Sequence, residues 1–247
     1  MVPKSKIEIE SMIKGGRILA SILLKLKQST VLGVSTKSID NKAYSLCKEN
    51  LVKPAFLGYE GFPASSCISI NSTIVHGVPS DYVINDGDLV SIDFGIIYKG
   101  LYLDGATSFQ VGKSDPKVES FLHVGKLSRD AGIRASVVGA YVSDIASAME
   151  NPVLKGGYSV VRELTGHGIG YRLHEKPFIP GYSIPERGMQ LVDGMTLAIE
   201  SMISMGSPEI VDKGNGWDLY TKDGSLTCHF EHTILVSGNI PKILTQL

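Results

Sequence analysis

Apolar side chains recur at spacings of three and four residues in two stretches of the chain, which predicts two amphipathic helices, and we expect two more helices further along. A Ser-Asp-Pro start signal precedes the third of them, and Gly156-Gly157 ends the fourth. We expect these helices at residues 7–32, 37–52, about 116–135 and about 140–156.

Stretches rich in β-branched and apolar residues lie between and after these helices. They cover residues 67–75, 89–98, 101–111, 158–163, 195–204 and 226–236. Several follow one another as hairpins, without the regular strand-helix alternation that builds a parallel sheet. We therefore expect an α+β fold, a largely antiparallel sheet with helices on its outer face. No linker divides the chain, so we expect a single domain over residues 1–247.

Two segments of the chain repeat one pattern. INDGDLVSID (84–93) aligns without gaps to LVDGMTLAIE (191–200), and both contain Asp-Gly, four residues, then Ile and an acid. A His-x-x-Pro precedes each copy, and a strand with another acid follows each. The sequence therefore predicts two related halves with three matched pairs: His76 with His174, Asp93 with Glu200, and Asp104 with Glu231.

Acidic residues in these halves interrupt apolar segments. Asp93 and Glu200 stand in runs that otherwise look like buried strands, with few Lys or Arg nearby. Burying several unpaired carboxylates is costly, whereas two divalent cations would balance four of them. A turn near residues 98–100 would place Asp93 and Asp104 on one face of a hairpin if its length is even or a bulge restores the register.

His167 adds a nitrogen donor without a counterpart in the first half. It lies in TGHGIG, where glycines allow close backbone approach and special dihedral angles. We interpret it as the ligand that makes two metal positions unequal. Four carboxylates and one imidazole suit Mn(II), Fe(II), Co(II) or Zn(II). Two such ions roughly 3.5–4 Å apart would share a water poised to attack a carbonyl group.

The other histidines and the glycines have simpler interpretations. We expect His123, His229 and His232 to be ordinary core or surface residues, and an extended strand would point His232 away from the face of Glu231. The glycine-rich stretch at His167 lacks the following Lys-Ser/Thr of a phosphate-binding loop.

Composition narrows the class of protein. The chain is 43% hydrophobic, has a net charge of -1 and has no apolar run long enough to span a bilayer, so we expect neither membrane insertion nor general nucleic-acid binding. Its charged N-terminus lacks a secretory signal, and three cysteines without metal-site spacing fit free thiols in the cytoplasm. Residues 1–53 hold ten basic and four acidic residues. Solvated helix faces explain this excess, with a weak contact to ribosomal RNA as the alternative.

The motif set resembles that of the type I methionine aminopeptidases over nearly the whole chain. The spacings of 11 between the aspartates and 7 between the two later histidines match, and no long helical insertion of the type II enzymes is present. The resemblance implies the pita-bread fold, a pseudo-twofold α+β domain with the metals at its centre. The motifs are IVHGVPS, SIDFG, LYLDGATSF, TGHGIG, RLHEKP, LAIES and FEHTI.

The resemblance also implies residue roles. Two divalent ions, Co, Mn, Fe or Zn, would be held by Asp93, Asp104, His167, Glu200 and Glu231. Glu200 would exchange protons with the attacking water, His174 would stabilise the tetrahedral intermediate or hold the scissile amide, and His76 would contact the peptide beyond that bond. The free α-amine of the substrate would bind one metal. The methionine side chain would enter an apolar pocket formed by Tyr59, Phe62, Cys67, Leu173 and Trp217.

The implied function is removal of the initiator methionine from nascent proteins with a small second residue, by a cytoplasmic monomer without specific DNA binding. One alternative is an aminopeptidase of the same fold that cleaves X-Pro bonds. Another is a pita-bread binding protein that has lost catalysis. Such proteins typically lack several metal ligands, and all five are present here.

Overall fold

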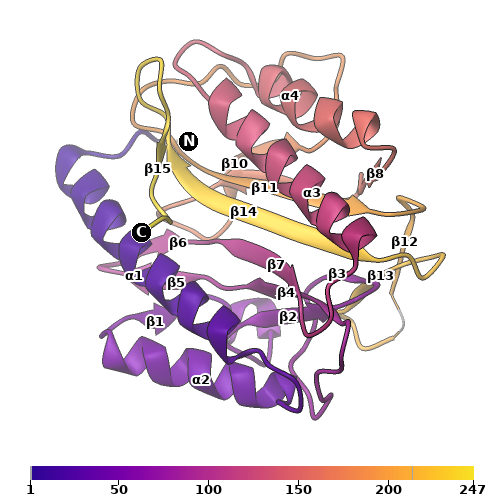
Figure 1. Ribbon diagram of the computed structural model, residues 1–247. Coiled ribbons are helices and arrows are strands. Elements are labelled where there is room, and N and C mark those ends of the chain that lie inside the picture. Colours follow the sequence, from indigo (N-terminus) through magenta and orange to yellow (C-terminus); the bar gives the residue numbers. More distant parts are fainter. Residues whose placement is uncertain (1, 213) are drawn as a thin grey trace.

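The computed structural model describes residues 2–212 and 214–247, and its helices gather on one side of the sheets (Figure 1). The four expected helices are confirmed, with ends that differ by a few residues. The first begins at a capping box, in which Ser5 and Glu8 each accept a hydrogen bond from the other's backbone N–H. No helix within the described residues is long and apolar enough to cross a membrane. The helices are α1 (Lys6–Ser29), α2 (Thr36–Glu49), the short 3-10 helix η1 (Tyr59–Gly61), α3 (Pro116–Ala135) and α4 (Val142–Lys155).

All strand pairs among the described residues are antiparallel, as expected. The strands are β1 (Lys53–Pro54), β2 (Cys67–Ile70), β3 (Thr73–Val75), β4 (Leu89–Asp93), β5 (Ile96–Tyr98), β6 (Leu101–Leu103), β7 (Ala106–Gln110), β8 (Ser159–Val160), β9 (Thr165–Gly168), β10 (Glu175–Pro180), β11 (Thr196–Ser204), β12 (Ile210–Asp212), β13 (Leu219–Thr221), β14 (Thr227–Leu235) and β15 (Lys242–Ile243).

Some strands differ from the expected ones. The strand expected at 158–163 is shortened to β8, and the chain forms the unexpected strands β9 and β10 directly after it. Glycines in β9 and prolines in β10 conceal the alternating pattern that marks a strand in sequence. Pairing with long neighbouring strands, rather than local propensity, makes these segments extended.

The nine-residue strands β11 and β14 pair along their full length at the centre of the molecule. The larger sheet has the order β10-β9-β11-β14-β15, and β8 also pairs with β11. The main sheet of the first half has the order β2-β4-β7 and contacts β14. Helix α3 packs over β11 and β14, while α1 packs over β5 and β6 (Figure 1).

The repeat found in the sequence is present in the structure. Gly87 and Gly194 both have positive φ, of 88° and 84°, in the turn before β4 and β11 respectively. The N–H of Gly87 donates to the carbonyl of Val111, and the N–H of Gly194 donates to the carbonyl of Val236. The hairpin pair β4–β7 therefore corresponds to β11–β14.

This correspondence corrects one of the three pairs expected from the sequence. Val111 and Val236 are equivalent, and the residues seven positions before them are Asp104 and His229. Glu231 lies opposite Glu200 in the second half, and Ala106 lies opposite Asp93 in the first half. The residue equivalent to Glu231 is therefore Ala106. The sequence paired Asp104 with Glu231 by their order along the chain, which does not determine strand register.

Two buried hydroxyl groups join the halves by equivalent contacts, which we call the hydroxyl clasps. The Thr233 hydroxyl accepts from the Asp104 N–H at 2.9 Å and donates to the Asp104 carbonyl at 2.8 Å. The Ser108 hydroxyl accepts from the His229 N–H and donates to the His229 carbonyl, both at 2.8 Å. Thr233 and Ser108 are themselves equivalent in register, so each clasp is the counterpart of the other.

Removing one clasp is expected to destabilise the fold. Thr233→Val keeps the shape of the side chain but leaves the buried N–H and carbonyl of Asp104 without their partner, at a cost of about 2 kcal/mol or more. Thr233→Ser keeps the hydroxyl and loses one methyl group, at a cost of about 1 kcal/mol. Urea unfolding of both variants measures the difference, and equal losses would contradict a role for the hydroxyl.

Candidate active site

One pocket of about 310 Å³ brings together residues from both halves of the chain. All twelve residues singled out in the sequence for metal binding, catalysis or substrate contact line it. Nine further residues complete its lining, among them the apolar Phe56, Val75 and Met202 and a histidine, His229. The twelve are Tyr59, Phe62, Cys67, His76, Asp93, Asp104, His167, Leu173, His174, Glu200, Trp217 and Glu231.

Three of the four acids reach the pocket from strands, and Asp104 directly follows β6. Glu200 in β11 lies directly opposite Glu231 in β14. In the first half, β5 and β6 are joined by the two-residue turn Lys99-Gly100, with φ of 51° and 80°. This even length places Asp93 and Asp104 on one face, as the sequence analysis required.

Burial and mutual repulsion dominate the electrostatics of these acids. Burial, then Asp104 and Glu200, raise the pKa of Asp93 well above its ordinary value. Burial and then the charge of Glu200 raise the pKa of Asp104 to about 7. Burial and the other three carboxylates likewise raise the pKa of Glu231. Three of the four acids therefore resist ionisation unless a cation compensates them.

Glu200 behaves differently because it lies between imidazoles. Burial acts to raise its pKa, but His229, His167 and His174 together lower the pKa below its ordinary value. The Nε2 atom of His167 lies 3.4 Å from Glu200 Oε1, and the Nε2 atom of His229 lies 3.3 Å from Glu200 Oε2. Glu200 is therefore a carboxylate at neutral pH and can accept a proton.

The donor set fits divalent cations. Over residues 2–212 and 214–247, the ion pairs of these four acids involve only histidines, with no Lys or Arg. Oδ1 of Asp93 and Oε1 of Glu231 are buried without a hydrogen-bond partner. Two groups of donors lie close enough to hold an ion, Asp104 with His167 and Glu231, and Glu200 with His229 and Glu231. Oxygen and imidazole donors of this kind suit borderline divalent metals.

His167 is positioned by the close packing of β9 against β11. A side chain at Gly166 would meet the carbonyl oxygen of Ala198 at 2.6 Å, so the expected close backbone approach is confirmed. The expectation of special dihedral angles is wrong for Gly166 and Gly168, neither of which has positive φ. Nδ1 of His167 lies 2.9 Å from the Gly168 carbonyl, to which it must donate. This leaves Nε2 unprotonated in the neutral ring and directed at the acids.

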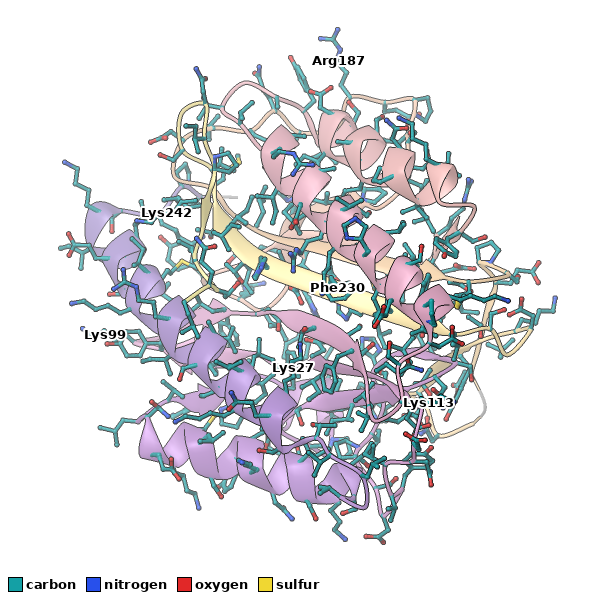
Figure 2. The ribbon with its side chains drawn as sticks, in the orientation of Figure 1. Lys27, Lys99, Lys113, Arg187, Phe230 and Lys242 are labelled. Atoms are coloured by element: carbon teal, nitrogen blue, oxygen red, sulfur yellow. The ribbon has the colours of Figure 1, made fainter. Side chains whose placement is uncertain are left out.

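His229 is the residue that the sequence analysis missed. It was expected to be an ordinary core or surface residue, but its side chain lines the pocket beside Glu200. Phe230 packs on the opposite side of β14 with apolar residues of α3, where Figure 2 shows it beneath that helix. Alternation along the strand therefore directs both His229 and Glu231 into the pocket. The spacing of two residues between His229 and Glu231 was the signal in the sequence that could have identified His229 as a pocket residue.

His232 follows the expected pattern. Its Nδ1 atom lies 2.9 Å from the Thr245 hydroxyl, and burial followed by the charge of Arg129 lowers its pKa to about 3. His232 does not line the pocket, and His123 is exposed on α3. Both therefore have the structural or surface character expected of them.

His76 and His174 line the pocket together with the acids. His76 has φ of 58°, a strained conformation, and Asp218 fixes the following turn by accepting from the Val78 N–H at 2.8 Å. The His174 ring packs edge-on against His167 at 4.5 Å, and its Nδ1 atom lies 3.0 Å from the Tyr59 hydroxyl. Desolvation and then His167 lower the pKa of His174 to about 4, so its ring is neutral at pH 7.

Apolar side chains form the wall beside the acids. Phe62 and Trp217 pack edge to face at 5.1 Å, in one cluster with Cys67 and Leu173. Asp40 holds the adjoining loop by accepting hydrogen bonds from the backbone N–H groups of Ser65 and Ser66. The pocket thus joins a charged floor to an apolar wall.

Comparisons with known proteins agree with this geometry. A model described as metallopeptidase family M24 matches residues 10–238. The methionine aminopeptidase of Borreliella burgdorferi is 39% identical over 245 residues, 99% of this chain and 98% of that protein. Methionine aminopeptidase 1 of Bacillus subtilis is 38% identical and covered completely. The crystal structure of methionine aminopeptidase from Thermotoga maritima has a TM-score of 0.97 at 38% identity, over 100% of both chains.

The chain belongs to metallopeptidase family M24, among its methionine aminopeptidases. A metal-dependent aminopeptidase was expected, and the family confirms it. The prolidase from Pyrococcus furiosus has a TM-score of 0.81 at 24% identity, over 100% of this chain and 66% of that one, and so shares the fold. The expected pita-bread fold is confirmed by these matches.

Metal binding to this M24 member is expected to release protons, because ligand carboxylates must be ionised. With its pKa of about 7, Asp104 is mostly protonated at pH 6 and mostly ionised at pH 8 in the metal-free protein. More protons are therefore released at pH 6. Calorimetric titration with Co(II), in buffers of different ionisation enthalpy, counts them at each pH. Equal numbers would contradict the raised pKa.

The same shift has a consequence for the stability of the metal-free protein. The folded-state pKa of Asp104 lies above the ordinary value, so the native state holds this proton more tightly than the unfolded state. Its contribution to stability is therefore present at low pH and is lost as the pH rises to about 7.

Proposed function

We propose that this protein removes the N-terminal methionine from nascent polypeptides whose second residue is small. The observation that carries the proposal is the pocket itself, where two donor groups sharing Glu231 lie beside the apolar wall of Phe62, Cys67 and Trp217. Full-length similarity to methionine aminopeptidases supports the choice of substrate.

Five residues would hold two divalent cations, and Co, Mn, Fe or Zn would suit these oxygen and nitrogen donors. When bound, such cations supply Lewis-acid polarisation of the peptide carbonyl and lower the pKa of a water molecule. The five are Asp93, Asp104, His167, Glu200 and Glu231.

Glu200 acts as the general base and then as the general acid. The pKa of Glu200 lies below its ordinary value, so Glu200 can take a proton from the attacking water and return it to the leaving amine. In the metal-free protein the other three acids have raised pKa values, so each keeps its own proton to a higher pH than Glu200 does.

His174 stabilises the tetrahedral intermediate. With Nδ1 assigned as the acceptor from the Tyr59 hydroxyl, Nε2 of the neutral ring carries a proton that it can donate to the developing oxyanion. His76, which precedes the turn that Asp218 fixes, contacts the peptide beyond the scissile bond. The methionine side chain packs against Tyr59, Phe62, Cys67, Leu173 and Trp217.

The reaction class is tested with peptides that separate this function from X-Pro cleavage. With Mn(II) or Co(II), we expect rapid release of methionine from Met-Gly peptides, slow release from Met-Leu peptides and no cleavage of Ala-Pro peptides. Chelation should stop the reaction. Cleavage of Ala-Pro without methionine release would favour the alternative, because prolidases and X-Pro aminopeptidases share this fold. No cleavage of any peptide under metal loading would favour a binding protein.

Removing single donors is expected to abolish cleavage without unfolding the chain. Asp104→Ala and His167→Ala should each lower kcat/KM for Met-Gly peptides by at least about 1000-fold, or about 4 kcal/mol. His123→Ala is the matched control, because this histidine is exposed on α3. Circular dichroism verifies folding, and full activity in either site variant would refute the assignment.

A further inference from the structure

The five ligands of the metal centre proposed above do not include the buried imidazole of His229. The His229 side chain is only 3% exposed, and its Nε2 atom has no hydrogen-bond partner. Glu200 Oε2 lies 3.3 Å from this nitrogen but not in the alignment that a hydrogen bond requires. Buried polar atoms are nearly always satisfied in native proteins, so an unpartnered one that faces a cluster of acids points to a missing ligand.

The distances around this nitrogen fit metal coordination. Nε2 of His229 lies 3.3 Å from Glu200 Oε2 and 3.9 Å from Glu231 Oε2. Two donors that each lie about 2.0–2.2 Å from one divalent ion are separated by roughly 3–4 Å. One ion can therefore contact all three side chains.

The two donor groups are alike in composition. Asp104, His167 and Glu231 form one, and Glu200, His229 and Glu231 form the other. Each contains one imidazole, one carboxylate of its own and the shared carboxylate of Glu231. His229 thus stands in the second group where His167 stands in the first.

The pseudo-twofold relation explains why the fold directs His229 inward. Asp104 and His229 are equivalent in strand register, and each is held by a hydroxyl clasp at its own backbone N–H and carbonyl. The contact that orients the Asp104 backbone therefore orients that of His229 in the same way. Both side chains line the same pocket.

We propose that His229 is a metal ligand, which completes the second position of the centre together with Glu200 and Glu231. The inference rests on the proposed function, because it adds a residue to the same metal centre. The full donor set is then four carboxylates and two imidazoles. A second imidazole favours Co(II), Fe(II) or Zn(II) over Mn(II), which prefers oxygen donors.

Proton NMR of the Co(II)-loaded full chain, labelled with 15N-histidine, counts the imidazoles bound to metal, because their ring protons are strongly shifted by the paramagnetic ion. We expect two such sets of resonances in the unsubstituted protein and one in His229→Gln. His232→Gln is the matched control, since this residue lies three positions along the same strand outside the pocket. It should keep both sets.

Metal affinity provides a second measurement. In His229→Gln, the dissociation constant of the weaker Co(II) site should rise by more than the 10–100-fold that loss of an outer-shell partner typically causes. In His232→Gln it should change by no more than about twofold, because no donor is removed.

A single set of shifted resonances in the unsubstituted protein, or two sets persisting in His229→Gln, would overturn the inference and leave His229 as a neighbour of Glu200. If His229→Gln does not fold, the count in the unsubstituted protein decides, with His167→Gln expected to retain one set. If the protein releases methionine but binds metal through only one imidazole, the assignment of His229 is refuted and the proposed function stands. A protein that takes up no Co(II) and releases no methionine would refute the proposed function itself.

Discussion

The hydroxyl clasps hold the two halves of the molecule together at the floor of its active site. Where β14 passes the first half, Thr233 satisfies the backbone of Asp104 and Ser108 satisfies that of His229. In a continuous sheet, the N–H and carbonyl of each of these residues would bond to a neighbouring strand. Here one buried hydroxyl group takes the place of both backbone partners. The clasps therefore let acids from separate halves converge without exposing backbone polar groups.

Convergence of four carboxylates creates an electrostatic problem, because within residues 2–212 and 214–247 their ion pairs involve histidines and no Lys or Arg. Three histidines lower the pKa of Glu200, while burial and repulsion raise the pKa values of the other three acids. A site of this kind gains most from divalent cations, since they pair with all the acids together. Burial and ligand binding are thus coupled, and metal uptake is linked to pH through the protons that the acids give up.

The fold is shared by methionine aminopeptidases and prolidases. The prolidase from Pyrococcus furiosus shares the architecture at 24% identity, whereas similarity to the methionine aminopeptidases extends over the whole chain at close to 39%. In this chain, aromatic and apolar side chains of Phe62, Trp217 and Leu173 stand beside the charged floor.

The sequence by itself determined the helices, the main hairpins and the convergence of acids from two halves. The apolar periodicity that predicts a helix is a local property of the chain. The repeated Asp-Gly marked the equivalent strands β4 and β11 of the two halves. The sequence located the turn between Asp93 and Asp104 but left its length open, and the structure shows that it has two residues. Only the tertiary structure decided that Asp104 corresponds to His229, that β9 is a strand, and that His229 faces Glu200. These depend on register and close packing between segments more than a hundred residues apart in some cases, such as Ser108 and His229. Hydrogen bonds across such separations leave no local pattern in the chain.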